Sequence, residues 1–503
     1  MSPIQIPSST DPFEIAAPGD YLLAANETVP AINFQTGIAA DLTVAGTTDQ
    51  IGALAAADGS SVTVAETGVV TGRIGFQGTS GLDENGVFTF FPVRDIAVVN
   101  TGRIGSADTS LGGIEIQFGS VLNAGDILAD PLAISGPTTG VFTWGGAVHN
   151  TGTISGYFSA IFVQGFGEVG FEEGVSIVND GDIVNCENGI GAVTASFDVT
   201  NTGVISLLPG TSTGIGIQSL FARTATVVNS GEITAGQVAS HTGFHDTLED
   251  PVGAVMVTNT GTMTGVTGGI TTSYANTTIA NEGTITTADG AAILFRYDPL
   301  YQATGLTLDN SGRIEGQSGT AISIEAEEGG DPGTVLGADI TNTGEIIGDV
   351  TLSEAGDTFD GRGGSLAGML FTEGGDDLVF AGESGATVAA GDGADGMLGG
   401  AGADFFDGGA GADTMVGRGG VNTLTGGAGA DRFVITDRTE ETTITDFETG
   451  IDVLDLSVFD ATGALVLSRL SETADGVRLD LGPGEVLFDG LTFADLDPGD
   501  VLL

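Results

Sequence analysis

The sequence predicts an all-β protein: a right-handed parallel β-helix, which is a solenoid, followed by a parallel β-roll. Two observations favour this fold class. A short phrase built on Asn-x-Gly recurs between residues 98 and 347, and a nine-residue phrase rich in glycine and aspartate recurs between residues 393 and 434. Because sequence repeats of this kind stack one supersecondary unit on the next, they indicate a solenoid.

The composition limits the partners of the chain. Of 503 residues, 67 are acidic and 12 are basic, for a formal net charge of −55, and every base is an arginine. Such a surface repels nucleic acid and anionic lipid, because both require clustered cations, so we expect no nucleic-acid partner. The charge fits either solubility in a salty medium or neutralisation by bound divalent cations. The single cysteine, Cys186, excludes an intramolecular disulfide framework and is expected to be a small buried apolar residue.

The first repeat places an asparagine and a glycine at regular corners. Successive asparagines lie between 22 and 32 positions apart; the shortest interval is about the length of one turn of a three-sided parallel β-helix, and loops account for the excess. Short β-branched runs precede each asparagine. We expect Asn-x-Gly to form the corner because both residues tolerate the left-handed backbone region. The asparagines are Asn100, Asn123, Asn150, Asn179, Asn201, Asn229, Asn259, Asn281, Asn310 and Asn342.

The residues around each corner indicate three sides per turn. One apolar residue between polar neighbours follows the corner, as at Ile104, Ile154 and Ile205, and period-two alternation points it inward. A third apolar segment often follows. Stacked corner asparagines are expected to hydrogen-bond to one another along the helix. An ordinary β-sandwich would give no reason for one phrase to recur at this spacing.

The second repeat places an aspartate or asparagine every nine residues. Asp395, Asp404, Asp413, Asn422 and Asp431 each follow a glycine by two positions and precede an apolar residue by two. The glycines are Gly393, Gly402, Gly411, Gly420 and Gly429. Asp377 keeps the same phase, and a degenerate copy with Ala386 separates it from Asp395. The pattern, GGxGxDxUx, resembles the calcium-binding nonapeptide of the RTX family of exported proteins.

This resemblance covers about residues 352–503 and implies that calcium (Ca2+) is bound by these aspartates, by Asn422 and by the glycine turns. Two nonamers would form one turn of a flattened roll, with Asp395, Asp413 and Asp431 on one edge and Asp404 and Asn422 on the other. Calcium takes about six to eight oxygen ligands, so an ion between turns would convert carboxylate repulsion into a cross-link and contribute folding free energy. Because Asn422 and Gly417–Arg418 depart from the pattern, we expect the Asp404–Asn422 site to be the weaker.

The same resemblance implies a route of export. Residues 444–457 resemble the segment that closes such rolls, and the final LTFADLDPGDVLL resembles an uncleaved C-terminal signal for type I secretion from Gram-negative cells. We therefore expect a type I secretion apparatus as partner and an extracellular or cell-surface location. The N-terminal stretch lacks the basic and apolar regions of a Sec signal peptide. The sequence has no uninterrupted run of about 20 apolar residues, which is the length needed to span a membrane, so no transmembrane segment is expected.

Groups suited to catalysis are scarce. Polysaccharide lyases, epimerases and hydrolases built on β-helices require a cation and a base or paired carboxylates, whereas this chain has three histidines and no lysine. His241 and His245 are spaced i, i+4 without the zincin glutamate, and GTSTG at 210–214 lacks the strand–turn–helix setting of a nucleophile elbow. Outward threonines such as Thr262 and Thr264 form only an interrupted version of an ice-binding ladder. We expect no enzymatic activity.

These observations predict four regions: an N-terminal cap with irregular first rungs (1–60), the β-helix (61–350), the calcium roll (351–445) and a β cap with the secretion signal (446–503). The predicted function is that of an extracellular, calcium-dependent structural protein of a surface layer, adhesin or matrix. Self-assembly or cell-surface polysaccharide would supply its contacts. The alternatives are a secreted β-helix carbohydrate-active enzyme and, less favoured, an ice-binding protein.

Overall fold

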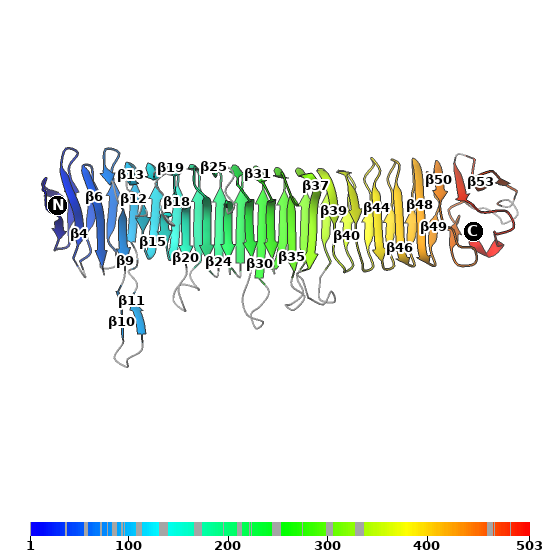
Figure 1. The fold of residues 1–503 in the computed structure, drawn as a ribbon, viewed down its shortest axis with the longest axis horizontal. Helices are drawn as coiled ribbons and strands as arrows, with labels where there is room; N and C mark the ends of the chain where they lie inside the picture. Colours follow the sequence, from blue (N-terminus) through cyan, green and yellow to red (C-terminus); the bar gives the residue numbers. More distant parts are fainter. Residues whose placement is uncertain are drawn as a thin grey trace. The chain divides into compact units, whose positions relative to one another are not determined.

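The described chain is an all-β parallel solenoid, as predicted (Figure 1). The computed structural model describes residues 2–503 except 36–37, 55–58, 71–72, 78, 83–87, 92–93, 95, 107–112, 130–138, 165–173, 195, 209–213, 221, 223, 244–252, 274, 298–304, 327–336, 460–465, 467 and 483. Contacts divide the chain into two compact units, Met1–Thr247 with Gly253–Thr271 and Leu248–Val252 with Thr272–Leu503. The four predicted regions are not tested by this division and stay a prediction.

In the first unit, each regular turn has three strands, and each strand pairs in parallel with its counterpart one turn away. The first side consists of β1 (Ile4–Ile6), β3 (Asp20–Leu23), β5 (Asp41–Val44), β7 (Ser61–Val64), β12 (Ile96–Asn100), β15 (Phe118–Asn123), β18 (Gly145–Asn150), β21 (Val175–Asn179), β24 (Ser196–Asn201), β27 (Thr224–Asn229) and β30 (Gly253–Asn259). The second side consists of β8 (Val69–Val70), β13 (Arg103–Ser106), β16 (Asp126–Ala129), β19 (Thr153–Ser155), β22 (Asp182–Val184), β25 (Val204–Ser206), β28 (Glu232–Thr234) and β31 (Thr262–Gly265). The third side consists of β9 (Ile74–Gln77), β14 (Ile114–Glu115), β17 (Thr139–Thr143), β20 (Ser159–Gln164), β23 (Asn188–Val193), β26 (Ile215–Leu220) and β29 (Val238–Gly243).

The first turns of this unit are less regular. β2 (Phe13–Ile15) pairs with β4 (Thr28–Phe34), and β4 pairs with β6 (Thr47–Leu54). β6 is long enough to pair with both β8 and β9, so it covers two sides of a turn. β10 (Thr79–Leu82) and β11 (Phe88–Phe91) form an antiparallel pair.

The second unit begins with three-sided turns and continues with two-strand turns. Its first side consists of β33 (Ala275–Asn281), β36 (Leu306–Asn310), β38 (Asp339–Asn342), β40 (Thr358–Asp360), β43 (Leu378–Phe380), β45 (Gly396–Leu398), β47 (Thr414–Val416), β49 (Arg432–Val434), β51 (Val453–Asp455) and β55 (Val501–Leu502). The remaining sides consist of β34 (Thr284–Thr287), β35 (Ile293–Tyr297), β37 (Arg313–Ala326), β39 (Glu345–Thr351), β41 (Ser365–Ala367), β42 (Met369–Phe371), β44 (Thr387–Asp392), β46 (Phe405–Gly411), β48 (Val421–Gly429), β50 (Glu441–Ile444) and β54 (Glu485–Asp489). From β43 to β49 each turn has two strands, which is the predicted parallel roll.

The inward positions form a continuous apolar core within each unit. Ile104 pairs with Ile127, and Ile127 pairs with Ile154, so the residue after each corner meets its own copy one turn on. All three are fully buried, as the period-two alternation predicted. In the two-strand turns the inward residues Met397, Phe406, Met415, Leu424 and Phe433 are buried in the same way.

The corner asparagines form the predicted hydrogen-bonded ladders. In the first unit the side-chain amide of each asparagine donates to the side-chain oxygen of the next at 2.7–2.8 Å, from Asn100 to Asn259. In the second unit the same bonds join Asn281 to Asn310 and Asn310 to Asn342 at 2.7 and 2.8 Å. These side chains are buried, so the bonds satisfy polar groups that would otherwise lack a partner.

The prediction that the backbone at these corners is left-handed is wrong. Among the described residues, only Asn185, Glu373 and Arg418 are non-glycine residues with positive φ, and the corner glycines are not left-handed either. The corner glycine is needed for close stacking instead. A methyl group on Gly203 would lie 2.0 Å from the carbonyl oxygen of Gly181. Methyl groups would lie 2.0–2.2 Å from a carbonyl oxygen at the corner glycines Gly102, Gly125, Gly152, Gly181, Gly231, Gly261, Gly312 and Gly344. Stacking distance, rather than backbone torsion, therefore explains the recurring glycine.

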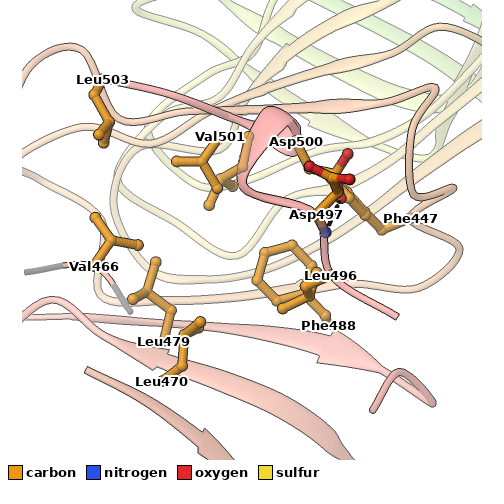
Figure 2. Close-up of a pocket in the computed structure, with 11 residues that line it drawn as sticks. Phe447, Val466, Leu470, Leu479, Phe488, Leu496, Asp497, Asp500, Val501 and Leu503 are labelled. Atoms are coloured by element: carbon orange, nitrogen blue, oxygen red, sulfur yellow. Dashed lines mark hydrogen bonds between the residues drawn. The ribbon is translucent and has the colours of Figure 1, made fainter. Parts of the chain in front are cut away.

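The second unit ends in an apolar cap. β54 pairs in parallel with β50 and antiparallel with β53 (Gly476–Asp480), which pairs antiparallel with β52 (Leu470–Glu472). Figure 2 shows apolar side chains, among them Leu479 and Phe488, around a cavity of about 70 Å³. Asp500, in the short 3-10 helix η2 (Pro498–Asp500), accepts a hydrogen bond from the Gly450 N–H at 2.8 Å. This hydrogen bond connects η2 to the loop that precedes β51.

Candidate metal centre

Two columns of side chains run along the two-strand turns, one at each edge. Paired strands there place residues 18 positions apart side by side, as with Met397 and Met415. The aspartate column consists of Asp357, Asp377, Asp395, Asp413, Asp431 and Asp452. The opposite column consists of Ala386, Asp404, Asn422 and Thr442. The predicted stacking is confirmed, whereas metal binding by these residues stays a prediction.

One carboxylate oxygen of each stacked aspartate is held by the peptide of the turn before. The N–H groups of Asp377, Asp395 and Asp413 donate to Oδ1 of the next aspartate in the column at 2.8, 2.8 and 2.9 Å. Asp431 donates in the same way to Asp452 at 2.9 Å. The repeated bond holds the carboxylates in one orientation from turn to turn.

The second carboxylate oxygen, Oδ2, has no hydrogen-bond partner in the interior of the aspartate column. It is buried and unpartnered in Asp377, Asp395, Asp413 and Asp431, whose side chains are 1–3% exposed. At the two ends the protein supplies donors: Ser353 N–H to Asp357 Oδ2 at 2.8 Å and Glu448 N–H to Asp452 Oδ2 at 2.7 Å. An unpartnered buried polar atom costs roughly 1–3 kcal/mol, and more when charged. A cation or a proton would satisfy these four oxygen atoms.

Burial and mutual repulsion favour the protonated carboxyls when no cation is bound. Burial, together with the like-charged neighbours Asp357 and Asp395, raises the pKa of Asp377 to about 7. Burial likewise raises the pKa of Asp413 to about 6, with Asp395 and Asp431 as like-charged neighbours. A cation between turns would favour the ionised carboxylates by replacing this repulsion with attraction.

At Gly408 a peptide oxygen and an aspartate Oδ2 face the same space. A methyl group on Gly408 would lie 2.4 Å from Asp413 Oδ2 and 2.6 Å from the carbonyl oxygen of Gly426. One turn on, a methyl group on Gly426 would lie 2.4 Å from Asp431 Oδ2. Among the described residues no three His, Cys, Asp or Glu side chains gather at one point, so an ion here would depend on peptide oxygens as well. Calcium is a hard cation that accepts both kinds of oxygen, so these residues fit it.

The opposite column is chemically different. Asp404 is its single carboxylate, and both of its oxygens have donors: Ala386 N–H to Oδ1 at 2.8 Å and Gly400 N–H to Oδ2 at 3.0 Å. Asn422 directs its amide nitrogen toward the Gly419 carbonyl at 3.1 Å, where a metal would require an oxygen. Burial raises the pKa of Asp404 to about 6. Equal spacing in the sequence therefore does not give equal sites.

The glycines predicted for the site allow the turns to stack. A methyl group on Gly411 would lie 1.5 Å from the carbonyl oxygen of Gly393, and one on Gly429 would lie 1.4 Å from that of Gly411. On the opposite edge, methyl groups on Gly402 and Gly420 would each lie 2.3 Å from backbone atoms of the turn before. These positions require glycine whether or not a metal binds.

The two ends of the aspartate column, Asp357 and Asp452, were not among the residues predicted for the site. Asp452 follows Gly450 and precedes Leu454 at the spacing of the motif, and this signal could have identified it. Asp357 precedes Phe359 at the motif spacing, but Ala355 replaces the expected glycine. Both side chains are buried and complete the ladder.

The other candidates do not form a catalytic group among the described residues. His149 Nε2 lies 2.7 Å from Asp180 Oδ2 in an exposed pair, and His241 lies on β29 beside Gln218 of β26. His245 and most of GTSTG at 210–214 lie outside the described residues. Cys186 is buried, as expected, and burial raises its pKa to about 11.

No family model matches the sequence, and a search of curated proteins finds no match. In the part of the chain that the structure describes, no helix has the length and apolar character to cross a membrane.

Proposed function

We propose that the two-strand turns are a calcium-binding β-roll of the RTX type, in which ions join neighbouring turns along the aspartate column. The observation that carries this proposal is the row of four buried Oδ2 atoms without a donor. The nonapeptide pattern of the same residues supports it, as does the carbonyl oxygen of Gly426, which lies beside Gly408 together with Asp413 Oδ2. Binding energy released there would contribute directly to folding.

A calcium titration of the full chain tests this proposal. After treatment with EDTA, isothermal titration with calcium chloride should show binding of several ions, and unfolding of the roll should move to higher temperature. Magnesium should substitute poorly, because it keeps its water ligands and demands a small octahedral site. Absence of calcium binding at millimolar concentration would overturn the proposal.

We further infer an extracellular structural role, as a component of a surface layer, adhesin or matrix. Two observations support this role: the net charge of −55 and the shortage of groups suited to catalysis. Calcium is scarce in the cytosol and plentiful outside, and extracellular calcium modules bind with dissociation constants on the order of 10⁻⁴ to 10⁻³ M. The roll would thus stay loose before type I export and fold outside the cell.

Divalent bridges between neighbouring molecules would be the natural mode of assembly, because strong like charge otherwise keeps molecules apart. Light scattering and electron microscopy with and without millimolar calcium chloride test this part. Growth of particles with calcium supports assembly. Persistent monomers would contradict a surface array and leave adhesion as the structural role.

A further inference from the structure

Arg418 occupies a position of the nonapeptide turn that is glycine in the neighbouring copies, at Gly400, Gly409 and Gly427. Its backbone has a φ of 62°, in the left-handed region that costs a side-chain-bearing residue about 1–2 kcal/mol. Gly409 and Gly427 have φ of 93° and 92° at the same position without this penalty. An arginine is thus held in strained backbone where glycine would be relaxed, which indicates that its side chain contributes something glycine cannot.

The guanidinium of Arg418 contacts a carbonyl oxygen on the same edge as Asp404 and Asn422. Its Nη1 donates to the carbonyl oxygen of Gly399 at 3.3 Å. Gly399 itself adjoins Asp404: a methyl group built on it would lie 2.2 Å from Asp404 Oδ2 and 2.4 Å from the carbonyl oxygen of Gly417. The positive charge of Arg418 also acts to lower the pKa of Asp404, against the larger effect of burial.

The glycine at the corresponding place on the aspartate edge has no such neighbour. There, Gly408 adjoins Asp413 Oδ2 and the carbonyl oxygen of Gly426, and Oδ2 has no donor. On the opposite edge Oδ2 of Asp404 has a donor, and the stacked partner, Asn422, is neutral. Asp404 and its like-charged neighbour Glu383 are partly neutralised by the Arg418 guanidinium, so a divalent cation would meet less negative charge here than along the aspartate column.

We propose that Arg418 is the built-in cation of the opposite edge and that the roll binds calcium along the aspartate column only. This inference rests on the proposed calcium-binding function and adds to it which edge is loaded. Both oxygens of Asp404 accept hydrogen bonds, Asn422 has an amide nitrogen in place of a second carboxylate oxygen, and Arg418 donates to the Gly399 carbonyl. Each of these contacts competes with calcium for an oxygen ligand, whereas Oδ2 along the aspartate column has no competing donor. The nonapeptide repeat is therefore metal-linked on one edge and protein-linked on the other.

A matched pair of variants tests the assignment. Asp413→Asn and Asp404→Asn change equally buried aspartates at the same position of the motif, one on each edge. Bound calcium per chain is measured by elemental analysis after equilibrium dialysis of the full protein against calcium chloride. We expect Asp413→Asn to bind fewer ions than the wild type and Asp404→Asn to bind the same number. Equal loss in both variants would overturn the inference.

A gain-of-site variant covers the case in which Asp413→Asn fails to fold. Arg418→Gly combined with Asn422→Asp restores the glycine and the carboxylate of the motif on the opposite edge. We expect this double variant to bind more calcium than the wild type, and unchanged calcium content would contradict the role of Arg418. If the wild type binds calcium and the double variant binds no more of it, only this inference is overturned. If the wild type binds no calcium, the proposed function is overturned and this inference with it.

Discussion

The side-chain ladder of the corner asparagines shows how single residues specify the three-sided turns. Each interior asparagine donates to one neighbour and accepts from the other, so removing one breaks two buried bonds. Asn179 donates to Asn201 at 2.7 Å, and Asn201 donates to Asn229 at 2.8 Å. The neighbouring asparagines would keep an unpaired amide or carbonyl group, which is the expensive outcome for a buried hydrogen bond.

We therefore expect Asn201→Ala to lower the free energy of unfolding of the first unit by about 1–3 kcal/mol, because two buried polar groups lose their partners. Thermal unfolding followed by circular dichroism measures the change. Asp198→Ala, at an exposed position of the same strand, is the control and should be close to neutral. Equal stability of the two variants would show that the ladder contributes nothing.

The corner glycines give a second prediction at this scale. A methyl group on Gly231 would lie 2.1 Å from the carbonyl oxygen of Gly203, so Gly231→Ala forces two turns apart. We expect a loss of stability of about 1–3 kcal/mol or more, as for other overpacked positions. Gly174→Ala is the matched control, since its methyl group would meet Ser196 at an ordinary 3.4 Å. If the two variants melted together, the stacking explanation for the corner glycine would fail.

At the scale of elements, the repeats determined how much could be predicted. The rung spacing predicted three sides, and the nine-residue spacing predicted two-strand turns with partners 18 residues apart, because strict periods leave few ways to stack. Asn422 and Gly417–Arg418 predicted a weaker site on the opposite edge, but the hydrogen bonds that distinguish the two edges could not be predicted. They depend on which oxygen of Asp404 meets the Gly400 N–H and on where the Arg418 side chain reaches, and neither is encoded in spacing.

The roll should also respond to pH in a direction opposite to that of ordinary salt-bridged aspartates. The pKa of Asp377 is raised to about 7 and that of Asp413 to about 6, above an unfolded value of about 3.9. A raised pKa means that the folded state binds the proton more tightly than the unfolded state. Each of these protonated carboxyls therefore contributes stability that is fully present below the unfolded pKa and is lost as the pH rises to 6–7.

For calcium-free protein, we expect the roll to unfold at a lower temperature at pH 8 than at pH 5. Differential scanning calorimetry in EDTA measures the shift, and the same scan with calcium chloride should reduce or reverse it because calcium competes with protons for the carboxylates. A calcium-free roll that is more stable at pH 8 would refute the stated ionisation of the column.

At the scale of the whole molecule, the account explains why so acidic a chain uses a repeat that concentrates carboxylates further. Each unit has a buried apolar core, but the two-strand turns contribute only one inward side chain per strand, such as Met415 or Leu424. A core this thin leaves the roll dependent on other links between turns. In the asparagine-ladder turns the protein supplies those links itself, whereas along the aspartate column we propose that the environment supplies them.

Hydrogen exchange read by mass spectrometry tests this central claim most directly, because it reports on each segment of the full chain separately. With calcium chloride, amides of residues 377–452 should be protected. After exhaustive chelation with EGTA their exchange should accelerate strongly, while amides of residues 100–259, where asparagines link the turns, should exchange as before. Unchanged protection of residues 377–452 after chelation would contradict the claim that calcium holds these turns together.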